Sequence, residues 1–254
     1  MKALPAICVA LALAGLDPAA AARAGTSETM DYDITWVGVS VGTLSIRSQT
    51  SEDGILRRTL RVWNRPWIAL VYPVDNTIAC RIEATAEGPR HTVTKKMGEK
   101  NFRQNDTLVL WPAAGRAVWS NAISNVVHSF AIPKGARDYV SFFFDLRDVA
   151  RGGKLKASDN YQLVMDNEVH ALEIRTGTPE LIRTPQGRIE AIPVKAISKS
   201  PPLFSRNKPR AVWVAASKPV VIFTDVETRF GAVRATLVEW TMDGAPVSLN
   251  SAPL

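Results

Sequence analysis

Residues 32–62 read YDITWVGVSVGTLSIRSQTSEDGILRRTLRV, and this stretch decides the fold. Apolar and polar side chains alternate within it, as they do in strands that bury one face. Asp53-Gly54 separates two of these runs, and an Asp-Gly pair in that position is a strong hairpin signal. Gly38 and Gly42 predict bends or bulges in the first strands. The chain therefore opens with antiparallel strands joined by tight turns.

The same pattern continues along the chain. Short strand-like runs alternate with turns, including a two-residue turn at Asp166-Asn167, and the polar, proline-rich residues 198–209 predict a loop. Residues 64–74 are apolar without a period of two, so they form either a buried plug or an exposed apolar lip. Many short strands with turns between them predict a mainly β protein with a curved antiparallel open sheet, or incomplete β-barrel.

The sequence pattern predicts one helix, over residues 139–150. Asp138 suits the N-cap, and residues 139–150 carry apolar side chains near helical spacing. Gly152 and Gly153 then provide a stop. Because this helix has an aromatic face to bury, we expect it to pack on the concave face of the sheet.

The first 24 residues have the three parts of a secretory signal peptide. Lys2 supplies the positive start, residues 6–16 form an apolar run, and Ala22-Arg23-Ala24 supplies a small-x-small cleavage site. The run is shorter than the roughly 20 apolar residues that span a bilayer, which disfavours a retained membrane anchor. We expect cleavage near Ala24 and a periplasmic protein with no transmembrane segment, built as one β-rich domain at 25–247 with a C-terminal tail at 248–254.

The charge balance favours an envelope setting over nucleic acid. Removal of the signal leaves 29 basic and 23 acidic side chains, a net charge of +6. The densest basic group is Lys95, Lys96, Lys100 and Arg103. In the envelope the acidic partners are anionic lipid head groups or acidic glycans, so we expect no nucleic-acid partner. A solvated surface explains the same excess without any partner.

The cysteine and histidine residues do not have the spacing of a metal-binding motif. Cys8 leaves with the signal, so Cys80 is alone and forms neither a disulfide nor a multi-cysteine metal site. It lies in a strand-like run, where a buried, inert thiol is the expected state. His91, His128 and His170 are far apart and lack ligand spacing, so each is expected to be a surface or hydrogen-bonded core histidine. We predict no metal and no cofactor.

Gly38-Val39-Ser40-Val41-Gly42 matches G-x-S-x-G, the nucleophile elbow of serine esterases. That motif requires a helix after the turn, whereas residues 43–46 are strand-like. A strand with two glycine bends is the better interpretation. A serine esterase that uses Ser40 is the least favoured of the functions considered.

Several stretches together resemble a known family. Residues 32–44 (YDITWVGVSVGTL) resemble the opening of the bacterial exported family known as domain of unknown function 3108, and residues 139–147 (YVSFFFDLR) resemble its helix. Residues 187–191, 212–214, 219–222 and 230–237 resemble its closing strands. In this chain Ala215-Ala216-Ser217-Lys218 stands where that family carries an acidic residue. The resemblance implies the architecture of periplasmic curved-sheet proteins such as lipoprotein carriers, with no established activity.

These observations predict a non-enzymatic periplasmic envelope protein without catalytic residues. The expected partner is a lipid-like or other amphiphilic ligand, or an envelope protein. The expected ligand-binding side chains are aromatic, although the same residues could fill an ordinary core: Trp63, Trp67, Tyr72, Phe143 and Phe144. The alternative is a structural or scaffolding protein that maintains the cell envelope, and the oligomeric state stays open.

Overall fold

A computed structural model describes residues 25–149, 160–200, 208–228 and 231–249. The chain is mainly β, as predicted. The strands before the long helix are β1 (Ser27–Trp36), β2 (Val39–Thr50), β3 (Leu56–Asn64), β4 (Val74–Thr85), β5 (Gly88–Glu99), β6 (Phe102–Trp111), β7 (Arg116–Asn121), β8 (Val126–Ala131) and β9 (Arg137–Asp138). Those after it are β10 (Asn160–Met165), β11 (Glu168–Thr176), β12 (Glu180–Thr184), β13 (Gly187–Ser200), β14 (Lys208–Ala215), β15 (Val221–Thr228), β16 (Gly231–Met242) and β17 (Ala245–Pro246).

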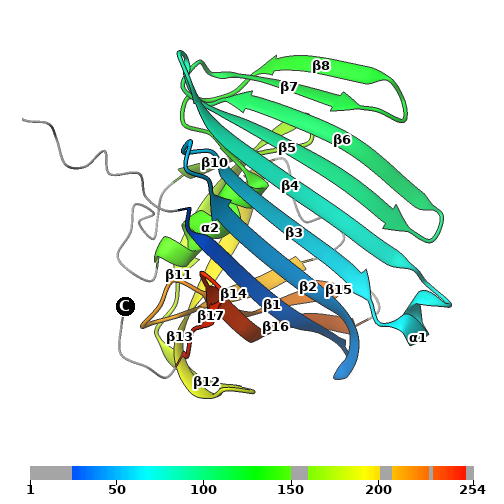
Figure 1. Cartoon of the computed structure of the whole chain (residues 1–254), viewed down its shortest axis with the longest axis vertical. Helices are drawn as coiled ribbons and strands as arrows, with labels where there is room; N and C mark the ends of the chain where they lie inside the picture. The colour runs from blue at the N-terminus through cyan, green and yellow to red at the C-terminus, as the bar shows by residue number, and fades with distance from the viewer. Residues whose placement is uncertain (1–24, 150–159, 201–207, 229–230, 250–254) are drawn as a thin grey trace, which may run out of the picture.

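The strands form one large, curved sheet (Figure 1). β1 to β8 pair in chain order as an antiparallel meander. β1 also pairs with β16, with Tyr32 opposite Leu237, and β16 leads through β15 and β14 to β13. β13 pairs with β11, β11 with β10, and β10 with the short parallel strand β9. The described sheet stays open, so the prediction of an incomplete barrel is confirmed.

Helix α2 (Tyr139–Val149) lies inside the curve of the sheet (Figure 1). It begins where predicted, because the Asp138 carboxylate caps its first turn by accepting the backbone N–H groups of Val140 and Ser141. Val140, Phe142, Phe144 and Leu146 of this helix all lie in the core, and because they are spaced around the helix axis, α2 is buried on more than one side. The predicted Gly152–Gly153 stop lies outside the described residues. The helix supplies the apolar filling that a curved sheet of this size needs on its concave face.

Two segments differ from the sequence interpretation, and in a third the structure decides between two alternatives that the sequence left open. The predicted loop at 198–209 is wrong at both ends, since β13 continues to Ser200 and β14 begins at Lys208. Residues 64–74 contain the short helix α1 (Pro66–Ala69) and form an exposed lip. Ser248 accepts a hydrogen bond from the buried Lys218 ammonium, and Leu249 lies in the core, so the chain is still packed at the start of the expected tail.

The two predicted glycine bends have different physical causes. Gly38 occupies the turn with a φ of +83°, a region that side chains with a Cβ seldom adopt. Gly42 lies where β2 passes the end of β3, and a Cβ there would stand 2.7 Å from the Trp63 carbonyl oxygen. The β1–β2 register shifts between Ile34 and Thr35, which is the predicted bulge.

Candidate functional site

A buried group of ionisable side chains is built around Asp138, at the end of β9. Its Oδ1 accepts the N–H groups of Val140 and Ser141 at 2.9 and 2.8 Å. Its Oδ2 lies 2.7 Å from the Ser141 hydroxyl and 2.7 Å from His91 Nδ1. Asp138 is fully buried, so every one of these contacts replaces water that the carboxylate lost on folding.

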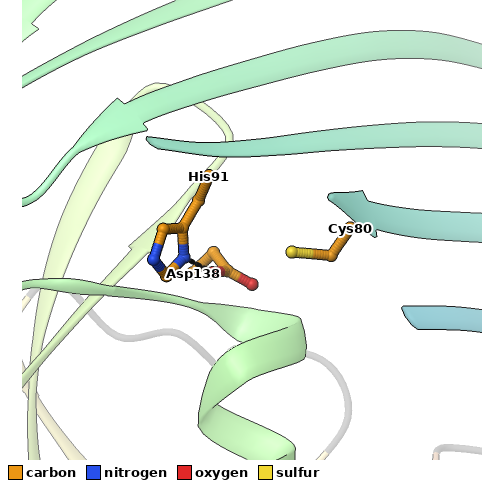
Figure 2. A group of neighbouring side chains, drawn as sticks. All are labelled: Cys80, His91 and Asp138. Carbon is orange, nitrogen blue, oxygen red and sulfur yellow. Dashed lines mark hydrogen bonds and ion pairs between the residues drawn. The ribbon is translucent and has the colours of Figure 1, made fainter. Parts of the chain in front are cut away.

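Cys80 completes this group from the next strand. β4 carries Cys80 and β5 carries His91, and the register places Ile82 opposite His91, so the two side chains share the inner face of the sheet. Figure 2 shows the thiol and the imidazole approaching Asp138 from different sides. One ligand atom from each of the three residues lies within 4.8 Å of the other two. All three residues are buried.

The surroundings move two of these pKa values in opposite directions. Burial, reinforced by the neighbouring Asp138 carboxylate, raises the pKa of the Cys80 thiol. Burial also acts to raise the pKa of Asp138, but hydrogen bonds from His91 and Ser141 outweigh it and hold that pKa below its ordinary range. The thiol is therefore protonated and the carboxylate is ionised at neutral pH.

This arrangement suits structure better than catalysis. A nucleophilic cysteine needs a lowered pKa and access to a substrate, and Cys80 has neither. Cys80, His91 and Asp138 are the described residues that could hold a metal ion. However, both Asp138 oxygens are already hydrogen-bonded, and a metal on His91 Nδ1 would have to break the 2.7 Å contact. We call these three residues and Ser141 the capping cluster, because they attach the start of α2 to β4 and β5.

The Cys80 environment leads to a direct chemical prediction. In the folded protein the thiol is expected to react with a thiol-exchange reagent at pH 8 at least about 100-fold more slowly than in denaturant, because it is protonated and buried. The release of the coloured thiolate from Ellman's reagent measures both rates. Rapid, stoichiometric labelling of the folded protein would contradict the inert state.

The structure separates the five predicted ligand-binding aromatics into two groups. Phe143 and Phe144 belong to α2, inside the curve of the sheet. Phe144 is 7% exposed and lies near two guanidinium groups, with the central carbon of Arg58 at 3.8 Å and that of Arg147 at 5.0 Å from its ring centre. This ring is a packed part of the core, which is the ordinary role that the sequence left open.

The other three aromatics lie at the opposite end of β3 from its turn with β2. Trp63 is half-buried near the end of β3, while Trp67 and Tyr72 are 55% and 47% exposed in the β3–β4 connection. Figure 1 places α1, which contains Trp67, far from α2. The five residues therefore do not form one site.

Trp67 and Tyr72 instead belong to a larger apolar surface. Four turns at the same end of the sheet carry exposed apolar side chains, and we call this set the apolar rim: Trp36, Val37, Val39, Trp67, Leu70, Val71, Tyr72, Phe102, Ile123, Val126 and Val127. Among the described residues, the other exposed large apolar side chains are Leu181, Ile197, Val238 and Met242. Exposed apolar side chains concentrated in one place mark interaction surfaces more often than scattered ones do.

Basic side chains accompany the rim. Lys100 and Arg103 flank Phe102 at the β5–β6 turn, and both are exposed. Lys96 is exposed farther along β5, whereas Lys95 points inward and pairs with Asp166 and, at 3.7 Å, with Asp106. Half of the basic group noted in the sequence therefore lies at the rim.

Ser40 lies on β2, next to the first turn, and not on an elbow. The chain continues from it as strand, without the helix that a nucleophile elbow requires. Its hydroxyl donates to Asp33 Oδ1 at 2.5 Å and accepts from Arg65 Nε at 3.1 Å. Ser40 thus ties the β1–β2 hairpin to the β3–β4 connection.

Comparison with known proteins places the chain in a family. A family model described as "Protein of unknown function (DUF3108)" matches residues 31–238. The chain belongs to the DUF3108 family. A search of curated proteins found no match.

The fold of this DUF3108 protein is similar to that of a protein whose crystal structure is known. A β-barrel-like protein of domain of unknown function DUF1849 from Brucella abortus superimposes with a TM-score of 0.56 over 87% of this chain and 99% of that one. Identity is 11%, so the likeness concerns the fold alone. Among the described residues of this DUF3108 protein, no helix has the length and apolar character that crossing a membrane requires.

Helix α2 of this DUF3108 protein also carries an ion pair, between Arg147 and Glu28, that the sequence did not reveal. Arg147, at the end of α2, donates from both terminal nitrogens to the Glu28 carboxylate at 2.7 and 2.9 Å, and from Nε to the Pro219 carbonyl. The Trp240 indole N–H donates to the same carboxylate at 2.8 Å. Arg147 therefore joins the end of α2 to β1, to β16 and to the segment before β15, far apart in sequence.

Proposed function

We propose that this protein is a non-catalytic component of the bacterial envelope that resides in the periplasm and binds an amphiphilic, lipid-like partner through the apolar rim. The observation that carries the proposal is the gathering of exposed apolar side chains in the turns at one end of the sheet. Leu70 and Val71 are 88% and 73% exposed, so covering them with an apolar partner recovers about 25 cal/mol for each square ångström removed from water.

The interior is a poorer place for the ligand. α2 occupies the concave side, and its aromatic side chains pack into the core. A separate shallow depression of about 380 Å³ lies beside β16 and β17, lined by Val238, Glu239, Trp240 and neighbouring residues. It is open to solvent, so it would bury much less of a ligand than a small-molecule pocket does. The rim is the surface that best matches an amphiphile.

A scaffolding function is the alternative, and one observation favours it. In the described part of the chain, β8 pairs only with β7, and its sequence VVHSFA is rich in strand-forming residues. An open edge of this kind can accept a strand from a protein partner. A periplasmic pull-down that recovers one partner, and loses it when Ser129→Pro blocks the edge without changing an apolar rim residue, would support scaffolding.

Export is tested on the full chain. We expect the protein to appear in the periplasmic fraction and N-terminal sequencing of the purified product to begin at Gly25, because Ala22-Arg23-Ala24 provides the cleavage site. An Ala24→Arg variant should accumulate as the longer precursor. A wild-type product that starts at Met1 and stays in the cytoplasm would remove the periplasmic setting.

Binding is tested with a zwitterionic amphiphile, lysophosphatidylcholine, below its critical micelle concentration. We expect the Leu70→Ser/Val71→Ser variant to lose at least about tenfold in affinity, because two nearly fully exposed apolar side chains are removed. Leu181→Ser is the matched control, since Leu181 is 69% exposed but lies on β12, outside the rim. Calorimetry measures the affinities. Equal affinity in all three proteins would refute the rim as the binding surface.

A further inference from the structure

We infer that the partner of the apolar rim is the surface of an anionic phospholipid bilayer, on which the four turns rest together. This inference deepens the proposed function and rests on it. A bilayer surface differs from a single amphiphile because it can receive several separate apolar groups at once and because its head groups carry negative charge.

The meander itself brings the four turns together. In an antiparallel series every second turn lies at the same end of the sheet, so the β1–β2, β3–β4, β5–β6 and β7–β8 connections share one side. Figure 1 shows them along one edge of the molecule, with α1 between the first and third. Each of the four turns contributes at least one rim residue.

The rim has the composition of an interfacial surface. Trp36, Trp67 and Tyr72 have rings with one polar atom, and Trp and Tyr concentrate where membrane meets water. Leu70, Val71 and Phe102 add wholly apolar side chains in neighbouring turns. Aromatic anchors beside aliphatic side chains are the pattern by which proteins lie on a bilayer.

The first turn is held in an unusual conformation. Val37 has a φ of +49°, which is rare for a β-branched residue, and its side chain is 69% exposed. Asn or Gly would fit that position with less backbone strain, and neither would present an apolar side chain at the tip. Lys100 likewise has a positive φ, of +35°, at the tip of the β5–β6 turn. The fold therefore presents an apolar and a basic side chain at turns that other residue types would form more easily.

The charges at this end favour an anionic surface. The acidic groups there are engaged: Asp33 pairs with Arg65 and Asp75 with Arg61, while Glu99 accepts a hydrogen bond from Asn76. Arg103 donates to the backbone carbonyls of Lys100 and Phe102, so its charge is not neutralised by those contacts. Lys100 and Arg103 thus supply positive charge next to Phe102.

The opposite end of the same strands has different chemistry. Its turns contain Glu52, Asp53 and Glu87, and none of the exposed large apolar side chains lies in them. Glu87 pairs with Arg116 and Lys134 is exposed at the same end, so the meander is polar with charges of both signs there, and apolar and basic at the other end. A flat, fluid surface suits separate tips of this kind better than a protein partner, whose contact surface needs continuous packing.

The experiment measures co-sedimentation of the full-length, exported protein with two kinds of vesicle. One contains phosphatidylcholine alone, and the other contains phosphatidylcholine and phosphatidylglycerol in equal parts. We expect preferential binding to the anionic vesicles that weakens as the Debye length falls from about 10 Å to about 3 Å with added salt. Trp67 should contact acyl chains, so brominated lipids should quench wild-type fluorescence more than that of Trp67→Phe.

Two pairs of variants separate the apolar and electrostatic contributions. Leu70→Ser/Val71→Ser is expected to reduce binding to anionic vesicles at least about tenfold, and Leu181→Ser to leave it unchanged. Lys100→Glu/Arg103→Glu is expected to reduce it by at least about tenfold and to remove most of the salt dependence. Lys134→Glu is the charge control, because Lys134 is exposed in a turn at the opposite end.

Other outcomes overturn the inference. Binding of lysophosphatidylcholine monomers without binding of vesicles would leave the proposed function standing and exclude the bilayer. Vesicle binding reduced equally by Leu181→Ser and Leu70→Ser/Val71→Ser would place the contact elsewhere. A dimer in sedimentation velocity that dissociates in the Leu70→Ser/Val71→Ser variant, with no vesicle binding, would identify the rim as a contact between two copies of the chain.

Discussion

Replacing Asp138 with alanine is expected to lower the free energy of unfolding by about 4 kcal/mol. The variant loses the N-cap of α2, which alone contributes about 1 kcal/mol. It also leaves the buried His91 imidazole and Ser141 hydroxyl without their acceptor, at about 1–3 kcal/mol for each unsatisfied group. Urea unfolding followed by circular dichroism measures the change.

A control variant separates capping from packing. Ser141→Ala removes one hydroxyl from the capping cluster and leaves the carboxylate with its other partners, so it should cost only about 1 kcal/mol. If Asp138→Ala proved no more harmful than Ser141→Ala, the capping cluster would not be what holds α2 on the sheet.

Asp138 also makes stability depend on pH. Its pKa in the folded protein lies below the value of about 3.9 expected in the unfolded chain. The carboxylate therefore stabilises the fold fully above that value, and the contribution is lost as the pH falls through the lower pKa of the folded state. We expect the unfolding free energy to decline in acid more steeply for the wild type than for Asp138→Asn, which cannot titrate. Parallel slopes would contradict this assignment.

Replacing Arg147 with methionine is expected to cost about 3 kcal/mol. Methionine keeps much of the side-chain volume but leaves the Glu28 carboxylate, largely buried, without its bidentate partner. Three nitrogen atoms donate to that carboxylate, two from Arg147 and one from Trp240, so the variant keeps only the Trp240 hydrogen bond. Thermal and urea unfolding give the change in stability.

A double-mutant cycle tests the origin of that loss. If the cost comes from an unpaired buried charge, Glu28→Gln/Arg147→Met should recover about half of it, because the neutral amide tolerates burial better. Strictly additive effects of the two substitutions would mean that the pair is not coupled. In that case Arg147 would act mainly through its contacts with Phe144 and the Pro219 carbonyl.

The helix and the hairpins could be predicted because their signals are local. Asp138 precedes a run with helical spacing, and the N-cap and the helix both occur where that pattern placed them. The Asp53-Gly54 and Asp166-Asn167 turns likewise join β2 to β3 and β10 to β11. The error at 198–209 arose because three prolines and several polar residues indicate a loop, whereas pairing with β11 extends β13 through Ser200.

The capping cluster could not be predicted, because it exists only through pairing of distant segments. Cys80 and His91 share a face through the β4–β5 register, and Asp138 reaches them from the start of α2. Cys80, His91 and Asp138 match no sequence motif that would have predicted their contact. The five aromatic residues were grouped into one ligand site for a related reason. Trp67 and Phe144 are both large and apolar in the sequence, and only the fold shows that Trp67 lies in an exposed turn and Phe144 in the core.

The position of β1 between β2 and β16 bears on how the chain folds. One neighbour follows immediately, and the other lies near the far end of the sequence. Such a high contact order predicts slow folding, since the sheet cannot be completed until β16 is available. In a chain exported as proposed, β1 would emerge early with an unpaired edge open to aggregation, so periplasmic chaperones should matter most before the C-terminal strands arrive.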